Sequence, residues 1–115
     1  MITLKMIKET TEQVFELEAE SLENPSRVPA IVDGRHAYWL AALYFGFKPT
    51  YVGEEIDRHH ATGYNSVTRC LYLCQAEAGY KRRINELFNN LKPYEKTEKV
   101  RYGITLFRCA VDAII

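Results

Sequence analysis

The sequence predicts a small all-α domain organised as a helical bundle. Along residues 10–91, apolar side chains recur at separations of three or four, the spacing of one face of an α-helix. Residues typical of helix ends, such as Ser, Thr, Pro and Gly, flank these segments. The 115 residues are enough for one modest core, so we expect a single domain.

The first two helices are expected over residues 10–24 and 26–46. In "TTEQVFELEAESLEN", Thr10 and Gln13 have the spacing of a capping box. This helix would carry one broad apolar face, formed by Val14, Phe15, Leu17, Ala19 and Leu22. In the second segment, Ser26 is the expected N-cap, Pro29 falls in the first turn and Gly46 ends the helix. The second helix should run through the core.

A short helix, a turn and a longer helix are predicted between residues 50 and 77. Thr50 is the expected N-cap of the short helix, which has room for two turns before Asp57. After a turn at residues 57–59, helical spacing resumes at His60. The expected apolar face of the longer helix consists of Tyr64, Val67, Leu71 and Cys74. This order of elements is that of a helix-turn-helix.

The rest of the chain divides into three parts. Residues 78–91 carry the apolar stripe of an amphipathic helix, residues 92–99 are a polar connector, and residues 100–115 are apolar, with helix favoured. We therefore expect a domain over residues 1–91, followed by a connector and an apolar C-terminal extension, residues 92–115, packed on the same domain.

Composition indicates a globular protein of the cytoplasm. Apolar residues make up 47% and charged residues 26%, unlike a disordered chain. Apolar runs stay below the ~20 residues of a membrane helix, and no basic leader opens the chain, so no membrane partner is expected. The odd set of Cys70, Cys74 and Cys109 is a poor disulfide framework, which indicates thiols in a reducing compartment.

The net charge of zero hides an uneven distribution along the chain. Residues 1–25 carry two Lys against six Glu, and residues 26–83 carry eight Lys or Arg against five Asp or Glu. Residues 84–115 carry five basic against four acidic residues. The middle of the chain is therefore its electropositive part, the part able to meet a polyanion.

The segment "EEIDRHHATGYNSVTRC", residues 54–70, has three chemical interpretations. Zinc is disfavoured because adjacent His59 and His60 would point ~100° apart on a helix, and their spacing to Cys70 and Cys74 is not that of a zinc site. Acid–base catalysis lacks a second titratable group converging on His60. With no P-loop, dinucleotide turn or nucleophile elbow present, we expect neither an enzyme nor a cofactor.

DNA reading is the third interpretation. The first turn of the second helix of a helix-turn-helix enters the major groove, while flanking basic residues hold phosphates. The residues at that place are Arg58, His59, His60, Ala61, Thr62 and Asn65. His60 can donate to a guanine, Thr62 offers a hydroxyl and a methyl, and Ala61 fits a thymine methyl. Arg69, further along the helix, would contact the DNA backbone.

Residues 52–62, "VGEEIDRHHAT", resemble the signature of the C-terminal DNA-binding domain of the bacterial replication initiator DnaA. The matching positions are Val52, Gly53, Ile56, Arg58, His60 and Thr62. The resemblance continues upstream in "SRVPAIVDGRHAYWLA", which matches at Ser26, Arg27, Ile31, Val32, Arg35 and Leu40. Together the similar regions extend over residues 7–91.

This resemblance implies a helical domain that binds double-stranded DNA, in replication initiation or its regulation and without ATPase activity. It implies that Arg35 enters the minor groove, that residues 59–62 read the major groove, and that Arg27 contacts phosphate. The chain departs from the signature at His59, where the family has an Asp that accepts hydrogen bonds, at Ala61 and at Gly63. Gly63 should also weaken the helix, by ~1 kcal/mol relative to alanine.

A protein-interaction module is the alternative function. The zero net charge, the acidic first segment, His59 and Ala61 favour a scaffold that no longer binds DNA. The apolar C-terminal segment would then serve as a partner-binding or dimer surface, with a replication or regulatory protein as the partner. The sequence does not fix the oligomeric state or a DNA target.

Overall fold

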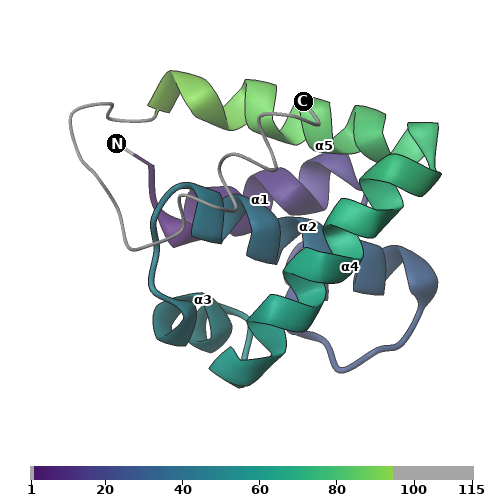
Figure 1. Ribbon diagram of the computed structural model, residues 1–115. Coiled ribbons are helices and arrows are strands. Elements are labelled where there is room, and N and C mark those ends of the chain that lie inside the picture. The colour runs from purple at the N-terminus through teal and green to yellow at the C-terminus, as the bar shows by residue number, and fades with distance from the viewer. Residues whose placement is uncertain (1, 95–115) are drawn as a thin grey trace.

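The protein is an all-α bundle. The computed structural model describes residues 2–94, which form five α-helices and no strand (Figure 1). The helices are α1 (Leu4–Val14), α2 (Pro29–Tyr44), α3 (Pro49–Glu55), α4 (Gly63–Ala76) and α5 (Ala78–Leu91). Three short 3-10 turns join or extend them, η1 (Ser21–Glu23), η2 (His60–Thr62) and η3 (Lys92–Tyr94). The predicted fold class is confirmed.

Helix α2 is the centre of the core. Every residue from 37 to 46 is buried, including the large Tyr38 and Trp39. A helix that is buried on all sides needs neighbours all round, and α2 contacts the other four helices. In Figure 1, α4 crosses in front of α2 while α5 lies along the top of the bundle, beside α1.

An aromatic cluster joins the end of α2 to α5. The ring centroids of Tyr44 and Phe88 lie 4.8 Å apart, and those of Phe45 and Phe88 lie 5.7 Å apart. The buried stripe of α5 is the predicted one, formed by Tyr80, Ile84, Leu87, Phe88 and Leu91. The chain reverses after α2 at Gly46, whose φ of 93° requires a glycine-like conformation. Its predicted role at the end of this helix is right to within one residue.

The first helix was placed wrongly from the sequence. It runs over Leu4–Val14 with Thr3 as its N-cap, so the expected helix over residues 10–24 with Thr10 at its start is incorrect. The helix ends because Glu16 adopts a φ of 56° and Leu17 N–H donates to Glu12 O at 2.8 Å, the pattern of a Schellman motif. The apolar residues beyond it reach the core through the turn η1, not through a continuous helix.

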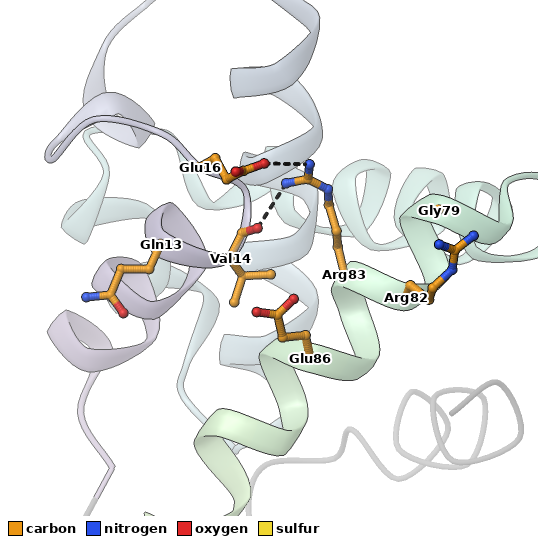
Figure 2. A pocket seen from close by; sticks show the side chains of 7 residues that line it. All are labelled: Gln13, Val14, Glu16, Gly79, Arg82, Arg83 and Glu86. Carbon is orange, nitrogen blue, oxygen red and sulfur yellow. Dashed lines mark hydrogen bonds and ion pairs between the residues drawn. The ribbon is translucent and has the colours of Figure 1, made fainter.

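Arg83 covers the end of α1 from α5. Its Nη1 donates to Val14 O at 2.9 Å and its Nη2 lies 3.1 Å from Glu16 Oε2, as Figure 2 shows. Val14 is the last residue of α1, so this bond satisfies a carbonyl that has no partner within the helix. A groove of about 650 Å³ lies beside this contact, with Arg82 directed away from Val14.

Two predicted N-caps and one helix face need correction. Helix α2 has Val28 as its N-cap instead of Ser26, and α3 has Lys48 instead of Thr50, because Pro29 and Pro49 supply the first helical residue in each. The buried face of α4 consists of Gly63, Ser66, Val67, Cys70, Leu73 and Cys74. Tyr64, predicted inside, is 60% exposed.

Gly63 explains the orientation of α4. A Cβ atom at this position would lie 2.6 Å from Trp39 Cζ3, closer than van der Waals contact allows. The glycine therefore lets the first turn of α4 pack directly on the indole ring, which rotates Tyr64 outward. Glycine was expected to weaken the helix at this position, but the close contact with Trp39 favours glycine over any residue with a Cβ.

The predictions for the C-terminal part fall mostly outside the described residues. Lys92–Tyr94 continue α5 as η3, whereas the expected apolar extension and Cys109 belong to residues 95–115. Within residues 2–94, no helix combines the length and apolar character needed to cross a membrane.

Candidate nucleic-acid interface

The predicted short helix, turn and longer helix are present. Helix α3 ends at Glu55, the chain turns through Asp57 with a φ of 54°, and Arg58 N–H donates to Gly53 O at 2.8 Å. The turn is so tight that a Cβ on Gly53 would lie 2.4 Å from Arg58 O. The longer helix was expected from His60, but residues 60–62 form the turn η2 and the α-helix starts at Gly63.

His59 shapes the start of this turn. Its Nδ1 accepts a hydrogen bond from Ala61 N–H at 3.1 Å, and Thr62 Oγ1 donates to His59 O at 2.9 Å. His59 therefore caps the turn as an acceptor, the role that the resemblance gives to an Asp at this position. Because Nδ1 accepts, the neutral ring carries its proton on Nε2, where it can act as a donor.

The two histidine rings lie against each other on the surface. Their centroids are 4.2 Å apart and their planes 29° apart, a stacked arrangement. His59, His60, Ala61 and Thr62 are all exposed, and so is Asn65 in the first turn of α4. The structure thus brings these predicted site residues together on an open surface. Their expected divergence on a helix does not arise, because His59 precedes the helical turn.

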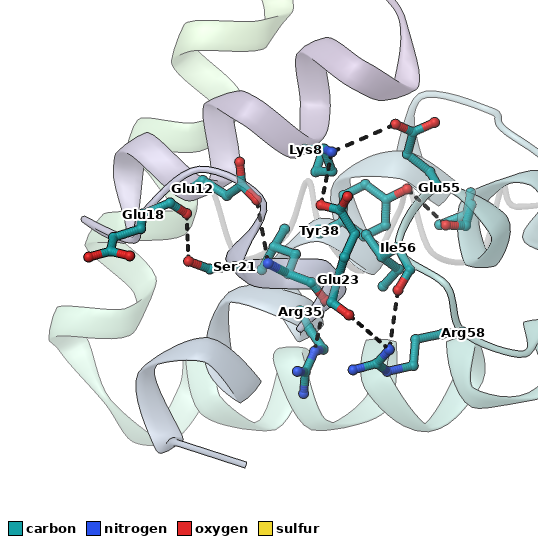
Figure 3. A network of polar contacts seen from close by, with 12 residues as sticks. Lys8, Glu12, Glu18, Ser21, Glu23, Arg35, Tyr38, Glu55, Ile56 and Arg58 are labelled. Carbon is teal, nitrogen blue, oxygen red and sulfur yellow. Dashed lines mark hydrogen bonds and ion pairs between the residues drawn. The ribbon is translucent and has the colours of Figure 1, made fainter. Parts of the chain in front are cut away.

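Arg35 and Arg58 are engaged by the protein itself. Arg35 Nε donates to Leu22 O at 3.1 Å, and its Nη2 donates to Asn24 O and to Ser26 O. Arg58 Nη2 donates to Asn24 O at 2.9 Å. The two guanidinium groups therefore share one carbonyl and hold residues 22–26 beside the α3–α4 turn, as Figure 3 shows for part of this contact. We call this arrangement the arginine clamp.

The two guanidinium groups of the clamp lie close enough for one charge to affect the pKa of the other residue. Burial, and secondarily the charge of Arg58, lower the pKa of Arg35. Arg35 nevertheless stays charged, since arginine is effectively always protonated. Arg27 follows the clamped segment directly and is exposed, so the clamp fixes the backbone from which this side chain projects.

A second polar network joins α1 to the same region. Lys8 Nζ lies 2.9 Å from Glu23 Oε1 and 3.9 Å from Glu55 Oε2 (Figure 3). Burial lowers the pKa of Lys8, but the hydrogen bond to Glu23 and the nearby carboxylates outweigh it, so the pKa is raised. Glu12 Oε2 accepts from Leu22 N–H at 3.4 Å, and burial raises the pKa of this carboxyl group.

Sequence reasoning missed this network. The relevant signal is the spacing of four between Lys8 and Glu12, which puts both on one side of a helix. It was overlooked because the first helix was expected to begin at residue 10.

Several titratable groups are buried in the core. Cys70 and Cys74 are free and buried, as predicted for thiols, and burial raises the pKa of Cys70 well above its ordinary value. Tyr80 OH lies 3.0 Å from Asp33 O and 3.3 Å from Cys70 Sγ. Among the described residues, no three His, Cys, Asp or Glu side chains form a group that could hold a metal ion.

One aromatic residue on α4 was also missed. Tyr72 is 56% exposed, and the Arg69 guanidinium lies over its ring, 5.1 Å from the centroid. Tyrosine is a common core residue, so composition alone gives no sign of this exposure.

No protein-family model matches the chain, and no curated protein matches it at a significant level of sequence similarity.

Proposed function

We propose that the protein binds double-stranded DNA through the α3–α4 turn and the outward side of α4. The observation that carries this proposal is the exposure of residues 59–62 at the start of the longer helix. A buried turn would have left only the scaffold of a helix-turn-helix. An exposed one offers short polar side chains to a groove at the position where such motifs read bases.

The side chains at the turn suit distinct contacts. His59 Nε2 and the His60 ring present donors to guanine or phosphate oxygens, and Asn65 can pair with adenine. Ala61 and the Thr62 methyl fit a thymine methyl, because the Thr62 hydroxyl already donates to His59 O. Arg27 and Arg69 are exposed cations able to meet phosphates on either side of the turn.

Arg35 and Arg58 can contact DNA directly only if their present hydrogen bonds change. Arg35 already donates to three carbonyls and Arg58 to Asn24 O, so direct contact with DNA requires them to share or release these bonds. An indirect role is compatible with the present geometry, since the clamp holds Arg27 beside the turn. We therefore assign the first phosphate contact to Arg27.

The biological setting follows from the resemblance to the DnaA DNA-binding domain. We propose a role in bacterial replication initiation or its regulation, in the cytoplasm, without ATPase activity. In this proposal the described helical body acts as a binder, a competitor or an adaptor.

A protein-interaction module is the second candidate function. A groove of about 400 Å³ lies between α1 and α3, and its lining is Leu4, Phe47, Tyr51, Glu54 and Glu55. Its lining combines apolar side chains with two acidic residues, which suits a basic peptide better than a polyanion. None of the residues that line this groove is a cation, so the groove does not itself support DNA binding.

A salt series separates the two functions. The affinity for a mixed-sequence duplex is measured by fluorescence anisotropy at several salt concentrations. A protein that makes about six phosphate contacts should lose about a thousandfold in affinity between about 50 and 200 mM salt. Weak binding that does not change with salt contradicts the DNA proposal and favours the interaction module.

Two substitutions test the site. His60→Ala should lower specific affinity by ~1 to 3 kcal/mol, whereas Asn89→Ala, at an exposed position of α5, should leave it unchanged. Arg35→Ala should lower affinity by a similar ~1 to 3 kcal/mol. Because Arg35 is part of the clamp, its free energy of unfolding is measured in parallel. Wild-type affinity in both variants would reject the site assignment.

A further inference from the structure

The outward side of α4 continues well beyond its first turn. Opposite the buried face, Asn65, Thr68, Arg69 and Tyr72 are exposed along one side of the helix. A solvent-facing stripe with a large aromatic residue and a cation has no role in the core. These side chains are therefore available for contact with a ligand.

Arg69 is the cation of this stripe, and its guanidinium is available. Among residues 2–94, Arg69 takes part in no hydrogen bond or ion pair, in contrast to Arg35, Arg58 and Arg83. Its guanidinium lies over the ring of Tyr72, 5.1 Å from the centroid, and its charge also acts at longer range on Asp33, where it partly offsets the burial that raises the pKa of that carboxyl group. Stacking on a ring leaves the N–H groups at the edge of the guanidinium plane free to point at an anion.

The position along the helix matches the width of a DNA groove. Tyr72 is seven residues beyond Asn65, which at a rise of 1.5 Å per residue is about 10 Å along α4. The major groove is about 12 Å wide, so a helix with Asn65 at the base edges brings residues 69–72 to the groove wall, where the phosphates lie.

We propose that Arg69 binds a phosphate of the DNA backbone and that Tyr72 is a positioning residue, which orients the Arg69 guanidinium for that contact. This inference rests on the proposed function, since it requires the α3–α4 turn to lie in a groove. It adds Tyr72 to the interface and gives it a role that acts through Arg69.

A double-mutant cycle on a mixed-sequence duplex of about 25 base pairs tests this pair. Arg69→Gln should weaken binding about tenfold at about 50 mM salt and reduce the slope of log affinity against log salt by about one. Tyr72→Leu should weaken binding about threefold, because the guanidinium loses its ring support, and Tyr72→Phe should bind as the wild type does. In the Arg69→Gln background, Tyr72→Leu should have no further effect.

The control is Arg82→Gln, which removes the same charge from an exposed position of α5. It should keep the wild-type salt slope. Both tested side chains are exposed, and thermal unfolding of each variant checks that the fold is intact.

The outcomes separate this inference from the proposed function. If the wild type binds with a steep salt slope, the inference is overturned by an unchanged slope in Arg69→Gln, or by a Tyr72→Leu effect of equal size in both backgrounds. If the wild type does not bind the duplex at all, the proposed function itself fails.

Discussion

Four arginines near the α3–α4 turn divide into two pairs with opposite surroundings. Arg35 and Arg58 are half-buried and donate to carbonyls of residues 22–26, whereas Arg27 and Arg69 are exposed. All four were predicted from the sequence to contact DNA. The structure shows that they do not share one role, because a guanidinium with several carbonyl partners stabilises the scaffold first.

The largest expected effect on stability is at Gly53, where two parts of the backbone of the turn lie very close to each other. Gly53→Ala places a Cβ 2.4 Å from Arg58 O, and a carbonyl of the backbone cannot move away as a side chain can. We expect about 3 kcal/mol of destabilisation, measured by urea unfolding. Gly79→Ala on α5 is the matched control, because a Cβ there has nothing within 4 Å. Equal stability of the two variants would contradict the steric requirement.

The clamp itself should show the next largest effect. Arg58→Ala leaves Asn24 O with one guanidinium partner fewer, and we expect a loss of about 2 kcal/mol in the free energy of unfolding. Arg27→Ala, at an exposed position, should change it by less than about 0.5 kcal/mol. The comparison between the two pairs breaks down if Arg27→Ala destabilises the protein as much as Arg58→Ala does.

The polar network around Lys8 offers a further test, because the contribution of Glu12 to stability depends on pH. Burial raises the pKa of Glu12, so the folded protein holds this proton more tightly than the unfolded chain does. The stability that this proton contributes is present below the unfolded-state pKa and is lost as pH rises through the folded-state pKa. Glu12→Gln should therefore flatten the decline in unfolding free energy from acidic to neutral pH.

Denaturant unfolding at a series of pH values measures this effect. Glu54→Gln changes an exposed carboxylate outside the network and should keep the wild-type pH profile. A Glu12→Gln profile identical to that of the wild type would show that burial of this carboxyl group does not influence stability.

The smallest effect on stability is expected at the exposed turn. His60→Ala removes a side chain without core contacts and should change the free energy of unfolding by less than about 0.5 kcal/mol. The same variant is expected to lose DNA affinity, so the two measurements together separate binding from folding. A large loss of stability would mean that the stacked His59–His60 pair supports the fold.

Several elements could be predicted from the sequence, and for a definite reason. The stripe of α5 has strong periodicity and few competing registers, and the short helix before the turn was expected from the room left before Asp57. The face of α4 was partly wrong because two registers share Val67 and Cys74, and only contact with Trp39 selects between them. The end of α1 was missed because it is set by Glu16 in a left-handed conformation, which sequence patterns associate with glycine.

The site was predicted less completely than the fold. Exposure of residues 59–62 could be expected from their polarity and their place after a turn. The clamp could not, because Arg35 and Arg58 bind backbone carbonyls up to 35 positions away, and a carbonyl has no residue type that marks it. Tyr72 was missed since exposed and buried tyrosines look the same in a sequence.

The α3–α4 turn has a consequence for how this protein could be altered. Gly53 and Gly63 on its two sides are fixed by steric contact, while the side chains from 60 to 62 project into solvent. The side chains of this segment can therefore be replaced while the two glycines keep the backbone of the turn in place. Randomising these three positions should yield many folded proteins with new surface chemistry, which makes the scaffold suitable for selecting altered ligand preferences.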